Sequence, residues 1–122
     1  PPNPAHIYQQ KVYVLTSGFT FSGGAEFASM IKMTNRGVFI GEETGGAYEG
    51  NVSSFNETIK LPNSKIKIAI PIVHFQIDVE PTLRGRGILP DYPVSQTQND
   101  YMNQRNAKLE YALELIMNNK GN

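Results

Sequence analysis

Residues 12–41 carry the pattern that most constrains the fold of this chain. Residues 12–16 are a short run of β-branched and aromatic residues, and a turn rich in glycine and hydroxyl groups follows at residues 18–24. From Ala25 onward the spacing of the apolar side chains is that of a helix with one buried face, which we expect to consist of Phe27, Met30, Ile31 and Met33. The stretch therefore begins as a strand, a turn and a helix.

A second strand is expected directly after this helix. Asn35, Arg36 and Gly37 supply a helix stop with glycine in the favoured place, and residues 38–41 form the next short apolar run. Strand, helix and strand in this order favour a parallel pair joined by a right-handed crossover. The sequence therefore predicts a layered α/β architecture.

Ser22 lies at the first turn of the expected helix, where two roles are open to a serine. Its hydroxyl can accept a hydrogen bond from a backbone N–H that the first turn leaves unpaired, which would make it an ordinary helix cap. The same unpaired N–H groups and the positive end of the helix dipole can also stabilise an oxyanion beside an activated nucleophile. Position on the helix permits both roles.

Three segments in a fixed order resemble one peptidase family, and they are VYVLTSGFTFSGGAEFASMIK, GVFIGEETGG and GRGILPDYPV. The chain resembles the C-terminal processing (tail-specific) serine peptidases, a family that also contains tricorn-type proteases and the interphotoreceptor retinoid-binding protein modules. The resemblance implies that Ser22, in the TFSG turn, is the nucleophile and that the Gly23 backbone N–H is half of the oxyanion hole. It also implies a crotonase-like layered α/β fold, with short parallel strands, a crossover helix, an antiparallel hairpin and a C-terminal helix.

Composition excludes several classes of function. The chain has 122 residues, which fits one small domain, and its 11 basic and 11 acidic residues give a formal net charge of zero. Without a basic run there is no footprint for nucleic acid and no polybasic membrane patch. The absence of cysteine excludes a disulfide, a thiolate metal site and a thiol nucleophile. No apolar run approaches the ~18 residues of a transmembrane helix, and no cofactor or metal site is indicated.

The opening PPNPAHIYQQ has no initiator methionine and is rich in proline, so residues 1–10 are expected to form an extended linker in which His6 is exposed. In the family this region lies inside the catalytic unit, with the first half of the protease core upstream. We therefore interpret the chain as the C-terminal part of a catalytic domain, with a core at residues 11–95 and a helical segment at 96–122. The missing N-terminal half is its expected partner, and the resemblance implies a bacterial periplasmic or cell-envelope location.

The loop at residues 42–47 distinguishes two branches of the family. Its glycines can simply serve a turn. In the branch that uses a Ser/Lys dyad, a lysine stands twenty-five positions after the nucleophile, which is Ala47 here, and no lysine lies between Lys32 and Lys60. The resemblance therefore points to the other branch, in which a histidine from the N-terminal half deprotonates the serine.

A hairpin is expected in the middle of the chain. Residues 51–61 alternate loosely, a turn follows at 61–64, and residues 65–72 alternate cleanly with isoleucine at every second position. The pattern predicts a half-buried antiparallel hairpin whose second strand ends or kinks at Pro71. His74, which follows it, is expected to be an interior or rim residue, with a surrogate base for Ser22 as the alternative.

The segment after the hairpin departs from the family pattern. In the tricorn-like branch a glutamate just before the glycine pair supports the active site, and Arg84 occupies that position here. Glu80 lies four residues earlier and replaces it only if the backbone carries it there. Pro90 and Asp91 are expected to fix the path of the chain rather than to do chemistry.

The last part of the chain reads as helical. Apolar residues at helical spacing predict an amphipathic helix over residues 107–118, with Asn106 as the N-cap and Gly121 beyond its end. Residues 99–103 form a separate helical turn. We expect this segment to be a structural cover without chemistry.

Three functions compete at this point. The leading one is the C-terminal half of a serine endopeptidase that acts on peptide or protein substrates, with Ser22 as nucleophile, Gly23 as an oxyanion donor and a histidine base outside this chain, so the chain alone is expected to be inactive. The alternative is a catalytically silent module of the same fold that binds a ligand or peptide. A crotonase-type acyl enzyme is a third possibility, against which the TFSG turn and the Pro90–Asp91 element argue.

We predict that position 47 is not where the base belongs. Ala47→Lys in the full-length protein should leave peptidase activity and its pH profile unchanged, because the serine already has a histidine as its base. Activity is measured on a peptide substrate across the pH range. A large gain with an alkaline shift would contradict this prediction and indicate a degenerate Ser/Lys dyad.

Overall fold

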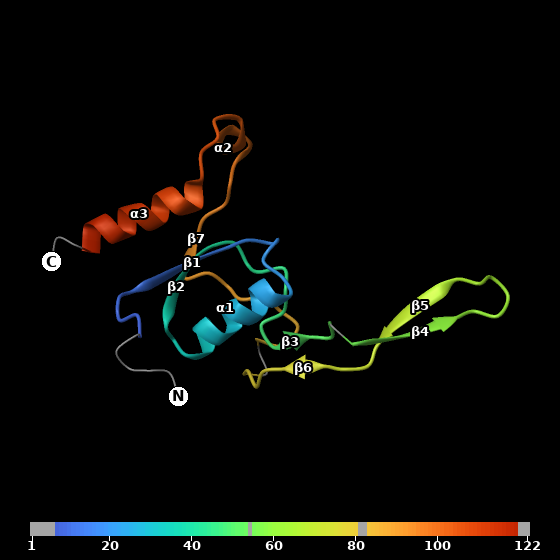
Figure 1. Ribbon diagram of the computed structural model, residues 1–122. Coiled ribbons are helices and arrows are strands. Elements are labelled where there is room, and N and C mark those ends of the chain that lie inside the picture. The colour runs from blue at the N-terminus through green and yellow to red at the C-terminus, as the bar shows by residue number, and fades with distance from the viewer. Residues whose placement is uncertain (1–6, 54, 81–82, 120–122) are drawn as a thin grey trace.

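The computed structural model describes residues 7–53, 55–80 and 83–119, and His6 lies outside them. Figure 1 shows the elements in chain order. They are β1 (Val12–Thr16), α1 (Gly23–Met33), β2 (Gly37–Gly41), β3 (Gly50–Asn51), β4 (Asn56–Lys60), β5 (Lys67–Pro71), β6 (Phe75–Gln76), β7 (Tyr92–Pro93), α2 (Gln98–Met102) and α3 (Ala107–Asn119).

The central sheet has the order β1-β2-β7 and is parallel throughout. β1 and β2 pair along their whole length, from Val12 opposite Gly37 to Thr16 opposite Gly41. α1 connects these two strands, so the expected parallel pair and crossover helix are confirmed. The mixed α/β class therefore follows from the local pattern of residues 12–41.

Both faces of the sheet are covered. On one face, Phe39 of β2 packs with Ala28 of α1 and with Ile88, and all three are buried. Neighbouring residues of a strand point to opposite faces, so Ile40 points the other way, and it is fully buried as well. Helix α3 lies against β1 and β2 and covers this second face.

The expected buried face of α1 is mostly wrong, because Ile31 is its only member that packs against the core, where it is partly buried. The helix buries Ala25, Ala28 and Ser29, whereas Phe27 and Met30 are 65% and 59% exposed. Small side chains let the helix lie close to the sheet, and the Ser29 hydroxyl donates a hydrogen bond to the Tyr48 carbonyl at 3.0 Å. Phe27, Met30 and Met33 are therefore left on the outer side of the helix.

The helix stop of α1 also differs from the expectation. Asn35, not Gly37, takes the left-handed conformation after the helix, with φ 51°. The Asn35 N–H donates to the Lys32 carbonyl and the Arg36 N–H to the Ile31 carbonyl, which is a Schellman stop. Gly37 is needed for another reason, because a Cβ there would lie 2.7 Å from the Ile31 side chain.

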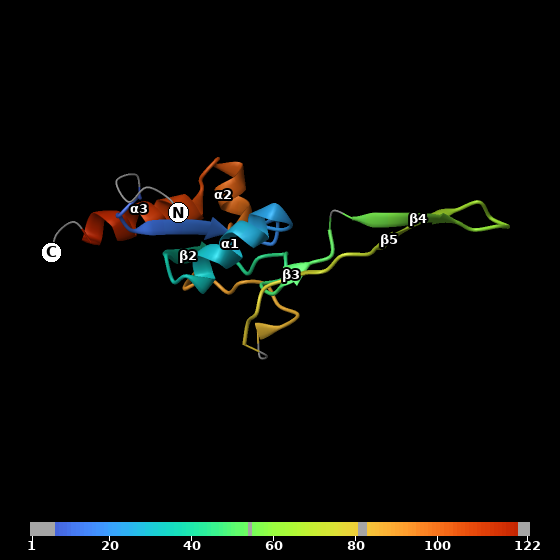
Figure 2. The ribbon, with the colours of Figure 1, turned by 60° about the horizontal axis from the view of Figure 1, so that its bottom comes forward.

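The central hairpin is confirmed, but its half-burial is not. β4 and β5 pair antiparallel from Asn56 opposite Pro71 to Lys60 opposite Lys67, so β5 ends at the proline as expected. Every residue of both strands is exposed, including Ile59 and Ile68. The hairpin projects from the body of the chain in both views (Figures 1 and 2), so no other described element covers its isoleucine face.

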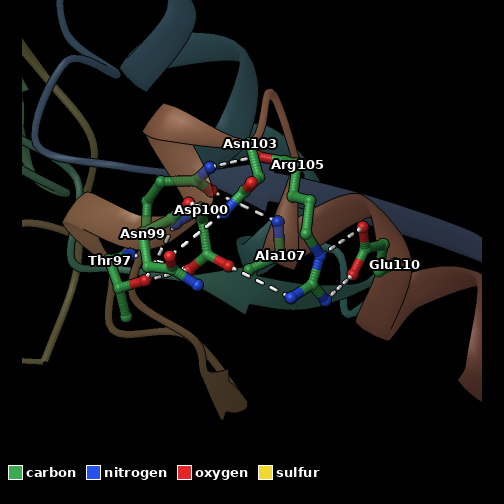
Figure 3. Close-up of polar contacts among 8 residues, drawn as sticks. Thr97, Asn99, Asp100, Asn103, Arg105, Ala107 and Glu110 are labelled. Atoms are coloured by element: carbon green, nitrogen blue, oxygen red, sulfur yellow. Dashed lines mark hydrogen bonds and ion pairs between the residues drawn. The ribbon is translucent and has the colours of Figure 1, made fainter.

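A polar corner joins the two C-terminal helices, and Figure 3 shows its contacts. Thr97 forms a capping box with Asp100 at the start of α2, and the Asn106 side chain accepts a hydrogen bond from the Leu109 N–H at the start of α3. Arg105 forms ion pairs with both Asp100 and Glu110. The separate helical turn, the last helix and its cap are therefore confirmed, although Leu109 and Leu113 of its apolar face are exposed. Gly121 lies outside the described residues. None of the helices in the described ranges is long and apolar enough to span a membrane.

Asp91 fixes the path of the chain, as expected. Its carboxylate accepts a hydrogen bond from the Phe39 N–H at 2.8 Å and pairs with the Lys32 ammonium at 2.7 Å. Partial burial opposes ionisation of Asp91, but these hydrogen bonds and the charge of Lys32 outweigh it and lower the pKa of the carboxyl. One side chain thus connects α1, β2 and the segment that enters β7.

We predict that Asp91→Asn lowers the free energy of unfolding by about 1 kcal/mol at neutral pH, because it removes the charged partner of Lys32. The folded-state pKa of Asp91 is lowered, so this stabilisation is present above the unfolded pKa of about 3.9 and is lost as the pH falls through the lower folded value. Urea unfolding at several pH values measures the difference. Asp78→Asn is the control, since Asp78 is exposed and no described residue pairs with it. A difference in the free energy of unfolding between Asp91→Asn and the unsubstituted protein that persists unchanged in strong acid would contradict the prediction.

Candidate active site

Ser22 stands at the junction between the β1–α1 turn and the helix, in an unusual backbone conformation. It is the N-cap residue of α1, with φ 52° and ψ −131°. A positive φ is uncommon for a residue with a side chain and costs on the order of 1–3 kcal/mol, so it persists only where surrounding structure fixes it. A strained strand-to-helix turn of this kind is also how α/β-hydrolases expose a nucleophilic serine.

The polar groups at this end of α1 are free to act on a ligand. The Ser22 side chain is exposed and makes no capping hydrogen bond. The first paired amides of the helix are those of Gly24, which donates to Phe21, and Glu26, which donates to the Ser22 carbonyl. Within the described ranges the Gly23 N–H has no acceptor. The side-chain hydrogen bond that would make Ser22 a helix cap is therefore not formed.

Hydrogen bonds within the turn hold its shape. The Thr20 N–H donates to the Ser17 carbonyl at 2.8 Å, and the Ser17 N–H donates back to the Thr20 hydroxyl at 3.0 Å. The Thr20 carbonyl accepts a third bond, at 3.0 Å, from the Gly46 N–H of the loop after β2. The turn that leads to Ser22 is therefore fixed both by itself and by that loop.

The loop of residues 42–47 lies directly against the backbone of this turn. A Cβ at position 45 would lie 2.0 Å from the Gly18 carbonyl oxygen, and one at position 46 would lie 2.5 Å from the Ala25 Cβ. Neither contact leaves room for a side chain. The two glycines therefore serve a close approach between loop and turn.

Residues 86–88 support the loop from its other side. The Ile88 N–H donates to the Thr44 hydroxyl and the Thr44 N–H donates to the Ile88 carbonyl, while a Cβ at position 87 would lie 1.9 Å from the Thr44 carbonyl oxygen. Glu43 pairs with Arg86 at 3.1 Å and also accepts the Gly87 N–H. The hydrogen bond from Arg86 lowers the pKa of Glu43, so this carboxylate stays ionised and paired.

A cavity of about 440 Å³ adjoins the turn. One wall is the turn itself, and the others come from the loop after β2 and the corner between α2 and α3. The lining residues are Ser17, Gly18, Phe19, Glu42, Glu43, Gln96, Tyr101 and Lys108. Phe19 is three residues from Ser22, so their Cα atoms are at most about 10 Å apart. The cavity is thus within reach of a peptide bound at Ser22.

Of the other residues singled out in the sequence, only Ala47 lies beside the Ser22 turn. It follows Gly46, at which a Cβ would lie 3.4 Å from the Ser22 N, and it forms an isolated antiparallel bridge with Gly87. His74 is exposed between β5 and β6, and it is not an interior residue. Arg84 and Glu80 are exposed, and no hydrogen bond or ion pair between described residues joins either of them to the turn. The part of the chain that the structure describes therefore brings no histidine base to Ser22.

Sequence reasoning missed the residues that brace the loop. Thr44 is buried, and its hydroxyl also donates to the Gly46 carbonyl at 2.8 Å, which makes it the link between Ile88 and the glycines. No local pattern marks Thr44, or the pairing of Glu43 with Arg86 over 43 positions. The structure places no group of three or more His, Cys, Asp or Glu side chains where its described residues could hold a metal ion.

The sequence matches the model of peptidase family S41 over residues 2–94. A protein of Sulfurisphaera tokodaii, assigned as a tricorn-like protease C-terminal subunit, is 28% identical over 117 residues. That alignment covers 95% of this chain and 13% of the relative. The chain thus spans a small part of the curated relative that it matches.

Solved structures show the same fold. A protein of Parabacteroides merdae, assigned as a peptidase, superimposes with a TM-score of 0.56 at 24% identity, over 88% of this chain and 32% of the other. Mature CPAF superimposes with a TM-score of 0.50 at 20% identity, over 81% of this chain and 18% of the other. At these identities the likeness establishes the fold and does not transfer a residue's role.

We predict that Gly45→Ala separates the loop from the Ser22 turn. Its Cβ would meet the Gly18 carbonyl at 2.0 Å, so we expect a loss of about 1–3 kcal/mol of stability and faster hydrogen exchange at the Gly46 amide. Gly18→Ala is the matched control, because nothing lies within 4 Å of a Cβ there. Urea unfolding and amide exchange measure both effects. Equal behaviour of the two variants would contradict the close packing described above.

Proposed function

The chain belongs to peptidase family S41, and we propose that it carries the nucleophile and one oxyanion donor of a serine endopeptidase. The observation that carries this proposal is the state of Ser22, which is exposed, strained and not engaged as a helix cap. Beside it, the Gly23 N–H is unpaired among the described residues. Strain and unused hydrogen-bonding capacity at one point are costs that a catalytic role explains.

In the proposed reaction the Ser22 Oγ attacks the carbonyl carbon of a peptide bond. The hydroxyl proton passes to a histidine that this chain does not supply, and the carbonyl oxygen becomes an oxyanion that accepts the Gly23 N–H. The C–N bond then breaks, the histidine returns the proton to the leaving amine, and an ester to Ser22 remains. Water, activated by the same histidine, hydrolyses the ester and restores the serine.

We also propose roles for the cavity beside Ser22 and for polypeptide outside this chain. The cavity beside Phe19 offers a place for side chains of a bound peptide or protein substrate. The histidine and the second oxyanion donor belong to an N-terminal half of the catalytic core, which accords with the small share of the relatives that this chain spans. A crotonase-like arrangement, the linker at 1–10, the core at 11–95 and the tail-specific activity are further parts of this proposal.

A catalytically silent binding module of the same fold is the second candidate. It is favoured by Arg84, which stands where the family resemblance implies a supporting glutamate. Glu80 lies nearby, and no described contact carries it to Ser22. In this case Ser22 and the cavity would bind a peptide without cleaving it.

We predict that Ser22→Ala in the full-length protein abolishes peptidase activity. We expect kcat/KM to fall by several orders of magnitude with little change in peptide affinity, because the nucleophile is lost and the binding contacts remain. Stability should change by less than about 0.5 kcal/mol, since the side chain makes no capping bond, whereas loss of a true cap costs about 0.5–2 kcal/mol.

Peptide hydrolysis, peptide binding and urea unfolding test these expectations. Ser64→Ala is the control, since Ser64 lies in the turn of the distant β4–β5 hairpin. A protein that binds peptide but shows no cleavage before the substitution would favour the silent module. Hydrolysis by the isolated chain that is lost on Ser22→Ala would contradict the external base and point to His74.

A further inference from the structure

Lys108 of α3 and Glu42 of the loop after β2 form an ion pair in the lining of the cavity beside the Ser22 turn. Their charged atoms lie 2.6 Å apart, although 66 positions separate the two residues in the sequence. The side chain of Lys108 is only 13% exposed, and that of Glu42 is 41% exposed. Both residues line the cavity of about 440 Å³. The cavity therefore contains an acidic and a basic group whose charges cancel.

Other contacts hold both members of this pair in place. The Glu42 N–H donates to the Thr16 carbonyl at 3.1 Å, and the Thr16 hydroxyl donates to the Glu42 carbonyl at 2.8 Å. Thr16 is buried at the end of β1, directly before the turn that leads to Ser22. A Cβ at position 41 would lie 3.1 Å from the Lys108 Cδ, so the lysine stem lies close to the backbone of Gly41. The pair thus connects α3 to the point where β1 and β2 end.

The remaining charge in the cavity lining is neutralised as well. Glu43 is the third charged residue of the lining, and its carboxylate pairs with Arg86 at 3.1 Å. The uncharged part of the lining includes the rings of Phe19 and Tyr101, which are 87% and 69% exposed. Among the described residues, each charged group of the lining therefore has a partner of opposite sign, and the cavity has no net charge.

We propose that the Lys108–Glu42 ion pair determines which substrate side chains this cavity accepts, and that it favours uncharged side chains over acidic and basic ones. A charged side chain that enters meets an ion of its own sign, and it loses water without gaining a free partner. An uncharged side chain avoids both costs, and the rings of Phe19 and Tyr101 offer it apolar surface. In this role α3 selects substrate, which is more than the structural cover that the sequence predicts.

The inference rests on the proposed function, because it takes the cavity as the place of a substrate side chain. Lys108 and Glu42 are specificity-determining residues in it, and they take no part in the transfer of protons or the acyl group. The pair then acts on the affinity for one substrate class relative to another. It leaves the chemical step at Ser22 unchanged.

Substitutions that remove one charge in the full-length protein test the proposal. Lys108→Met keeps an unbranched side chain beside Gly41 and leaves Glu42 unpaired, so KM should fall for peptides that place a lysine in the cavity and rise for those that place a glutamate there. Glu42→Gln leaves Lys108 unpaired and should have the opposite effect. We expect changes in KM of about 3- to 5-fold with kcat nearly unchanged. The double variant has no net charge in the cavity and should again favour uncharged side chains.

The probe is a library of internally quenched peptides in which one position at a time is glutamine, lysine or glutamate. Hydrolysis gives KM and kcat, and binding of the same peptides to variants that also carry Ser22→Ala gives affinity without cleavage. Lys60→Met and Glu114→Gln are the controls. Lys60 lies in β4 and Glu114 in α3, both are exposed, and neither forms an ion pair with another described residue.

Opposite shifts in the two single variants that cancel in the double variant would support the proposal. Equal losses for all peptides in folded variants would overturn it, because the pair would then only stabilise the fold, and so would a failure of every peptide to bind. Urea unfolding shows whether each variant is folded, and Glu42→Gln decides alone if Lys108→Met is not. A protein that binds peptides with these shifts but cleaves none would support the selective cavity and count against the proposed function, so the two failures are distinguishable.

Discussion

Close backbone packing at three glycines holds together the β1–α1 turn, the loop after β2 and the segment before β7. The loop after β2 meets the β1–α1 turn at Gly45 and Gly46, and the segment before β7 meets the same loop at Gly87. Side chains at these positions would overlap backbone atoms or the wall of α1. Three stretches that are distant in sequence thus pack together beside the turn in which Ser22 has a positive φ.

The positive φ of Ser22 costs free energy that other parts of the fold must offset, and the parallel sheet stabilises the fold. Phe39 and Ile40 are fully buried on its two faces, and Asp91 ties β2 to α1 through Phe39 and Lys32. The N-terminal end of α1 is exposed at Ser22 and Gly23. The inner side of α1 is therefore buried against the sheet, while its outer side is exposed.

Local pattern predicted the elements well and their surroundings poorly. The β1–α1–β2 unit, the β4–β5 hairpin and α3 follow from residue periodicity and turn chemistry, which are local properties. The buried side of α1 was missed because small residues decided it, and periodicity of large apolar residues identifies a face that is apolar without saying what covers it. For the same reason the isoleucine face of the hairpin was expected to be buried and is exposed.

The candidate site was also predicted only in part from the sequence. The family resemblance selected Ser22 and Gly23, but the sequence alone could not choose between a cap and a nucleophile. That choice depends on a backbone conformation and on bonds that are not made, and both depend on distant glycines. Thr44 and the pairing of Glu43 with Arg86 were invisible for a similar reason, since their partners are more than 40 positions away.

The most direct test of Ser22 as a nucleophile is covalent labelling of the full-length protein with a fluorophosphonate, followed by peptide mapping. An activated serine beside an oxyanion donor reacts with this probe, whereas a helix cap does not. We expect one modified residue, Ser22, and no modification after Ser22→Ala. A full-length protein that cleaves peptides while the label attaches to another serine, or to none, would contradict this expectation.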